Sequence, residues 1–217
     1  MARSRNVPLA PGRLRNYSFN RAGSINSNFQ SLYDFQAYPA AGTTQLLFFQ
    51  IPKGQGGKTY FDTNIEVAGS LPQPKRHLTK GISVVFFPGS PVNATGAIGT
   101  SGLNWQDTWT VMKSGWLEFF IGSTPYIDEA PIGRFPPSFR LAGQAAMADA
   151  TTAGAALHSQ IDYATFAGAA YPFTPVMLEP NQNFNVSLNW PTAVALPSTV
   201  AGRIGIILDG DLYRLAQ

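Results

Sequence analysis

The strongest constraint on the fold is a run of alternating side chains at residues 183–190. Phe184, Val186, Leu188 and Trp190 are large and apolar, whereas every residue between them is Asn or Ser. Successive side chains of a β-strand point to opposite faces of a sheet. The run therefore predicts a strand with one face in a core and the other face on a surface.

Short apolar runs bounded by Gly and Pro predict the remaining strands. The expected strands cover residues 45–51, 60–67, 82–87, 105–112, 116–121, 183–190, 203–208 and 212–215. Asp209-Gly210 lies between the last two and predicts a hairpin turn. Residues 89–104 and 122–139 are rich in turn-forming residues and are expected to be loops.

One segment departs from this β pattern. Eight of the residues in 141–159 are Ala, which favours a helix, although Gly143 and Gly154 weaken it. The fold class expected from the sequence is all-β. It is an eight-stranded jelly-roll-type antiparallel β-sandwich with long loops, one short helical insertion at about 141–159 and an extended N-terminal arm.

The arm, residues 1–30, differs from the sandwich, residues 31–217, in its charge. It contains five basic residues, namely Arg3, Arg5, Arg13, Arg15 and Arg21, and the first acidic residue of the chain is Asp34. Arginine can hold a phosphate bidentately, so the arm could bind nucleic acid. It could equally lie along a neighbouring subunit, or be a solvated tail.

The composition favours a surface that other protein surfaces cover. Charged residues are 12% of the chain, against roughly 25% in an average soluble domain, and aromatic residues are also 12%. Interfaces are depleted in Lys and Glu and enriched in aromatic residues. Trp105, Trp109, Trp116 and Trp190 are therefore expected to lie in interfaces or in the core. The alternatives are sugar-stacking Trp residues and a secreted β-domain with an uncharged polar surface.

Residues that carry chemistry are scarce. The chain has no Cys, and its two His residues, His77 and His158, have no partner at metal-ligand spacing. His77 follows Pro74-Lys-Arg in a polar turn and is expected to be a solvated or capping residue. Phosphate-binding, dinucleotide-binding and nucleophile-elbow motifs are missing. We therefore expect a protein without cofactor, metal or catalytic residues, and not an enzyme.

The N-terminus lacks the apolar segment of a signal peptide, and no apolar run approaches the length of a membrane span. Both observations favour synthesis in a cytoplasm.

Four stretches give the chain a family resemblance, which covers most of its length and is architectural. They are Phe48-Phe-Gln-Ile-Pro52, Phe61-Asp-Thr-Asn64, Leu178-Glu-Pro-Asn-Gln-Asn-Phe-Asn-Val186 and Leu208-Asp-Gly-Asp-Leu-Tyr-Arg214. With the Arg/Pro arm and the few charges, the chain resembles the jelly-roll major capsid proteins of small icosahedral viruses. It also resembles the single jelly-roll structural proteins of tailless bacteriophages.

The resemblance implies a self-assembling shell subunit of a virion, made in the host cytoplasm. Its partners would be copies of itself in capsomers and other virion proteins. The arm would face the shell interior and meet genome nucleic acid, an internal membrane or a neighbouring subunit. The alternative function is a phage spike or fibre module, or a carbohydrate-binding β-sandwich.

Overall fold

The computed structural model describes residues 25–89, 98–136, 144–148, 158–162 and 170–215. Most of these residues form strands, which are β1 (Ile25–Phe29), β2 (Leu32–Tyr38), β3 (Gln45–Phe48), β4 (Arg76–Phe87), β5 (Trp116–Ile121), β6 (Thr124–Pro131), β7 (Gln144–Ala148), β8 (His158–Asp162), β9 (Tyr171–Leu178), β10 (Phe184–Asn189) and β11 (Gly202–Leu215). The helices are α1 (Ile98–Lys113) and a short 3₁₀ helix, η1 (Ile132–Arg134).

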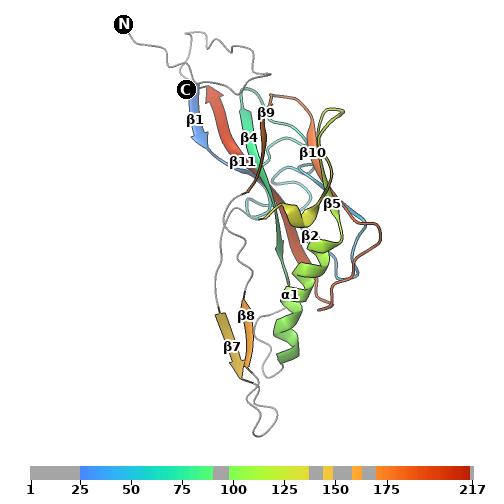
Figure 1. Cartoon of the computed structure of the whole chain (residues 1–217). Helices are drawn as coiled ribbons and strands as arrows, with labels where there is room; N and C mark the ends of the chain where they lie inside the picture. Colours follow the sequence, from blue (N-terminus) through green and yellow to red (C-terminus); the bar gives the residue numbers. More distant parts are fainter. Residues whose placement is uncertain (1–24, 90–97, 137–143, 149–157, 163–169, 216–217) are drawn as a thin grey trace.

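Two antiparallel sheets form a β-sandwich, as the sequence predicted. The first sheet has the order β1-β11-β4-β9, and β2 pairs with β11 on the same side as β1. The second sheet has the order β3-β10-β5-β6. The third pairing, between β7 and β8, forms a separate hairpin. Figure 1 shows this hairpin and α1 projecting together from one end of the sandwich.

The core lies between the two sheets and follows the alternation of the strands. β10 contributes Phe184, Val186 and Leu188, and the neighbouring β5 contributes alternate residues from Leu117 to Ile121. β4 and β11 face them with Ile82, Val84, Phe86, Ile204, Ile206 and Leu208. The strands predicted at 116–121 and 183–190 are therefore confirmed, and those at 45–51 and 82–87 match β3 and β4 in position.

The helix lies where the sequence predicted a loop and a strand. Residues 98–113 form α1, so the predicted strand at 105–112 is wrong. The buried residues in its second half are Asp107, Val111 and Met112, which have the i, i+4 spacing of a helix face. The indole Nε1 of Trp190 also donates a hydrogen bond of 3.1 Å to the carbonyl of Val111, which fixes this end of α1 to the core.

The predicted helical insertion at 141–159 is wrong in the part that the structure describes. Residues 144–148 and 158–162 are paired strands, with Ala146 opposite Gln160. The Ala content favours a helix only weakly, and strand pairing overrides that preference here.

The predicted hairpin at Asp209-Gly210 is also wrong. β11 runs continuously from Gly202 to Leu215, and its register against β4 shifts between Asp209 and Gly210, which marks a bulge. A Cβ at Gly210 would lie 2.0 Å from the carbonyl oxygen of Leu78, so the bulge requires Gly.

Three further expectations differ from the structure. Residues 60–67 form turns and isolated bridges rather than a strand, and 122–139 includes β6 and η1 rather than a loop alone. The arm predicted at 1–30 ends in β1, and its residues 1–24 lie outside the described residues. The described residues form eleven strands rather than about eight.

Candidate functional site

The free edge of β2 is covered by the connection between β3 and β4, residues 49–75. The amide of Phe35 donates to the carbonyl of Asp62 at 2.7 Å, and the amide of Tyr33 donates to the side chain of Asn64 at 3.0 Å. The Thr63 hydroxyl donates to the carbonyl of Tyr33 at 3.0 Å. These bonds hold residues 62–64 against β2, so the outward backbone groups of Tyr33 and Phe35 are not open to other strands.

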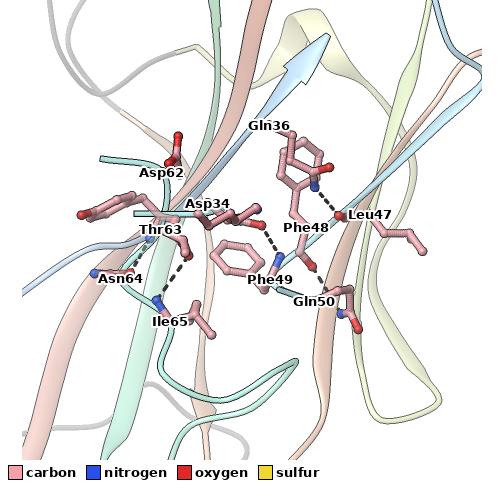
Figure 2. Close-up of polar contacts among 12 residues, drawn as sticks. Asp34, Gln36, Leu47, Phe48, Phe49, Gln50, Asp62, Thr63, Asn64 and Ile65 are labelled. Carbon is pink, nitrogen blue, oxygen red and sulfur yellow. Dashed lines mark hydrogen bonds and ion pairs between the residues drawn. The ribbon is translucent and has the colours of Figure 1, made fainter. Parts of the chain in front are cut away.

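A buried ion pair fixes the same connection from beneath. Asp34 is fully buried, and its carboxylate pairs with Lys58. It also accepts a hydrogen bond of 2.6 Å from the amide of Phe49 (Figure 2). Phe49 has a φ of 66°, in the left-handed region that costs a residue with a side chain about 1–2 kcal/mol. Burial raises the pKa of Asp34, and the bonds from Lys58 and Phe49 oppose that rise.

Arg203 of β11 joins this connection to the outer face of the five-stranded sheet. Its guanidinium carbon lies 4.3 Å from the ring centre of Phe35 and 3.8 Å from that of Phe61, so the cation is sandwiched between two rings. Arg203 also forms a 3.1 Å ion pair with Asp62. The Phe35 ring covers Gly205, where an added Cβ would lie 2.1 Å from it.

The result is a surface of exposed rings, which we call the aromatic patch. It consists of Tyr60, Phe61 and Phe87, with Phe35 and Arg203 beneath. Tyr60 and Phe61 are 72% and 73% exposed, and Phe87 stacks on Phe35 with ring centres 5.9 Å apart. Phe61 rests on Arg203, and the carbonyl of Tyr60 accepts a hydrogen bond from the Tyr33 hydroxyl.

The charges around the aromatic patch are paired within the chain. Besides the two ion pairs already described, Lys53 and Lys75 both pair with Glu66. A partner that covers the patch therefore meets exposed rings and one net positive charge, because Glu66 balances only one of Lys53 and Lys75. Ordered aromatic and Arg side chains are the typical contributors of binding energy in protein interfaces.

A second feature lies on the outward side of the four-stranded sheet, which we call the Glu118 network. The Glu118 carboxylate accepts hydrogen bonds from Trp116 Nε1 at 3.1 Å, Ser187 Oγ at 3.0 Å and Asn189 Nδ2 at 3.2 Å. Gln45 Nε2 donates to Asn189 Oδ1 at 2.9 Å. Within the described ion pairs none involves Glu118, so its hydrogen-bond partners here are neutral groups from β5 and β10.

The four Trp residues predicted as core or interface residues lie in different places. Trp190 is in the core and contacts the Tyr38 ring edge-to-face, with ring centres 5.4 Å apart. Trp116 is half-buried in the Glu118 network, and Trp109 on α1 is 54% exposed. Trp105 lies in α1, but its side chain is outside the described residues, as are the five Arg residues of the arm.

Sequence reasoning missed the residues that build the aromatic patch. Phe61 was expected in a strand, Arg203 carried no predicted role, and Asp34 served only as the first acidic residue. A signal was present, because an acidic residue inside the apolar run at 32–38 needs a partner if that run is buried. The position of that partner, Lys58, depends on the fold.

The described residues contain no group of three His, Cys, Asp or Glu side chains placed to hold a metal ion. Nor does any helix among them have the length and apolar character needed to cross a membrane. No protein-family model, curated protein or solved structure matches the chain.

Proposed function

We propose that this chain is a self-assembling capsid subunit of an icosahedral virus and that its sandwich is a jelly roll. Its partners are copies of itself and other virion proteins, and it is made in the host cytoplasm. The arm, with Arg3, Arg5, Arg13, Arg15 and Arg21, contacts a neighbouring subunit, the genome or an internal membrane. No catalytic step or cofactor belongs to this function.

The pairing of the eight sandwich strands supports the jelly-roll part of the proposal. When β1, β7 and β8 are left out, eight strands remain. The first of them, β2, pairs with the last, β11, and the second, β3, pairs with the second-last, β10. The series continues inward as β4 with β9 and β5 with β6. Four nested antiparallel pairs that roll into two facing sheets are the arrangement of a jelly roll, which occurs in capsids, lectins and cupins.

The observation that carries the function is the aromatic patch. Two large rings are more than 70% exposed, and each is held against a cation: Phe61 lies 3.8 Å from the Arg203 guanidinium carbon, and Tyr60 lies 4.7 Å from Lys53 Nζ. Burying such rings gains about 25 cal/mol per Å² of apolar surface, and little side-chain entropy is lost because the rings are already ordered. The low charge of the whole chain favours a copy of the same chain as the cover.

The test compares the full-length chain with Tyr60→Ser/Phe61→Ser by sedimentation velocity and negative-stain imaging. We expect the unchanged chain to form regular oligomers or shells, and the double variant to remain small with an unchanged unfolding midpoint. Tyr126→Ser on β6 is the control, since Tyr126 is a 49% exposed ring outside the patch. Normal assembly of the double variant would reject the patch as the contact.

A second candidate function, carbohydrate binding, is favoured by the Glu118 network alone. It combines a half-buried Trp with carboxylate, amide and hydroxyl groups on one sheet face, and such groups can contact a sugar ring and its hydroxyls. Saturable binding on a glycan array that Glu118→Gln abolishes would support this function. Binding that survives this change would reject the network as the sugar site.

A further inference from the structure

The junction between β1 and β2 has an unusual construction. Both strands pair with β11 on the same side and lie in line, with Phe29 opposite Asp211 and Leu32 opposite Leu208. The two residues between them, 30 and 31, lie opposite the β11 bulge. β1 is thus a separate five-residue extension of the edge, joined to β2 at one short break.

His77 of β4 lies fully buried at this break. Its Nε2 is 2.9 Å from the carbonyl oxygen of Gln30, and its Nδ1 is 2.9 Å from the Thr79 hydroxyl. A carbonyl can only accept, so Nε2 carries the proton and the neutral ring accepts from Thr79 at Nδ1. A Cβ at Gly210 would lie 2.8 Å from the ring, so the bulge leaves room for His77 and little more. This replaces the solvated turn residue expected from the sequence.

β1 itself is held lightly. Residues 27–29 are exposed, with Phe29 at 71%. Three polar contacts fasten the break. The amide of Gln30 donates to the carbonyl of Gly210 at 3.0 Å, the Ser31 hydroxyl donates to Asp209, and His77 donates to Gln30. A change at His77 therefore acts directly on Gln30, the residue that follows β1.

We propose that His77 is an acid-sensitive latch, whose protonation releases residues 25–30 from β11 while the two sheets stay folded. A second proton on the ring places a charge in a site built for a neutral imidazole, and opening the break lets water solvate it. The release frees residues 25–30, the part of the arm that the structure describes, and it does not require the chain to assemble.

The charged groups around His77 determine how readily its ring is protonated. Asp209 and Asp211 of β11 favour the protonated ring, and Lys80 of β4, which pairs with Asp211, opposes it. On the β9 side, His77 pairs with Leu178, and the next residue, Glu179, pairs with Arg76. Burial lowers the pKa of His77 to about 4 and outweighs the groups that favour the protonated ring, which are the Gln30 carbonyl and the two carboxylates.

The direction and size of the pH effect on opening follow from the difference in the pKa of His77 between the open and the closed form. An opened, hydrated His77 titrates near 6.5, so the open form binds the proton more tightly and gains population as the pH falls from 6.5 to 4. At pH 5, the two pKa values give an about 30-fold higher open fraction than at pH 7.5.

Hydrogen exchange of the full-length chain at pH 7.5 and pH 5, corrected for intrinsic rates, tests the latch. We expect amides in 25–30, and those amides in 211–215 that bond to β1 rather than β4, to lose roughly 30-fold in protection, while 32–38 and 202–208 keep theirs. His77→Gln, which can donate to Gln30 and cannot titrate, should lose this pH dependence. Equal protection of β1 at both pH values, or simultaneous loss across both ranges, would overturn the proposal.

A second measurement covers the case in which His77→Gln does not fold. His158→Gln leaves His77 as the single imidazole, because the chain has two His residues. Its NMR titration should report an apparent pKa well below 6.5, with the β1 amide signals shifting over the same pH range. Titration near 6.5 with β1 signals unchanged would overturn the latch.

Discussion

The carboxylate of Asp34 and the ammonium of Lys58 form an ion pair in which the two side chains are 0% and 10% exposed. The pair joins β2 to the connection that carries Tyr60 and Phe61, and Asp34 also accepts from the amide of Phe49. The display of the aromatic patch therefore depends on a charge interaction beneath it.

Asp34→Asn should lower the free energy of unfolding by about 3 kcal/mol, because it leaves Lys58 buried without its counter-charge. Chemical denaturation of the non-assembled chain measures this. Asp34→Asn/Lys58→Met removes both charges and should recover most of the loss. A single variant as stable as the unchanged chain would contradict a structural role for the pair.

Lys58→Met should give a pH-dependent loss of stability. Burial raises the pKa of Asp34, and removing Lys58 removes a group that opposes the rise. The folded chain then binds a proton that the unfolded chain, with a pKa near 3.8, releases, so stability falls as pH rises above that value. We expect Lys58→Met to be less destabilised at pH 5 than at pH 8 in urea titrations. The opposite order would show that Asp34 is not the affected group.

Gly205→Ala should disturb the aromatic patch from below. The added Cβ would lie 2.1 Å from the Phe35 ring, which must move and take Arg203 with it. Overpacking of this kind costs about 1–3 kcal/mol, and we expect weaker assembly as well. Gly133→Ala is the matched control, since its Cβ would meet only one atom at an ordinary 3.5 Å. Similar unfolding midpoints for the two variants would mean that Phe35 moves without cost.

Trp190→Phe should loosen α1. The change removes the donor to the carbonyl of Val111 and leaves space beside Tyr38, and a lost buried hydrogen bond alone costs about 1–3 kcal/mol. Hydrogen exchange should rise first in residues 106–113. Tyr126→Phe, on the half-exposed ring of β6, is expected to change neither quantity. Unchanged protection of α1 in Trp190→Phe would show that other contacts hold the helix.

The sequence predicted best those strands whose own residues show a β pattern, because such strands can be recognised without knowing which strands they pair with. β10 has an alternating pattern and β5 has a dense apolar run, each within a few consecutive residues. The burial of Phe184 and Leu117 follows directly from these patterns. β1, β2 and β9 were missed because pairing with β11 and β4, far away in sequence, makes them strands. The continuity of β11 through Asp209-Gly210 has the same origin, since a turn dipeptide became a bulge opposite Leu78.

The candidate site was harder to predict than the fold. The aromatic patch brings together Phe35, Phe61 and Arg203 from three separate segments, and no local sequence motif predicts that they lie in contact. His77 shows the same limit, because its neighbours Pro74 and Lys75 favour a turn while its pairing with Leu178 and Leu212 places it in a buried strand.

The central claim is that this chain assembles with copies of itself, and its mass in solution tests that claim most directly. Light scattering of the full-length chain at low and high salt, with negative-stain images of the same samples, gives the mass and the regularity of any particle. We predict discrete oligomers or closed shells with a mass that is a multiple of 23.4 kDa. A stable 23.4 kDa monomer under every condition would contradict the account.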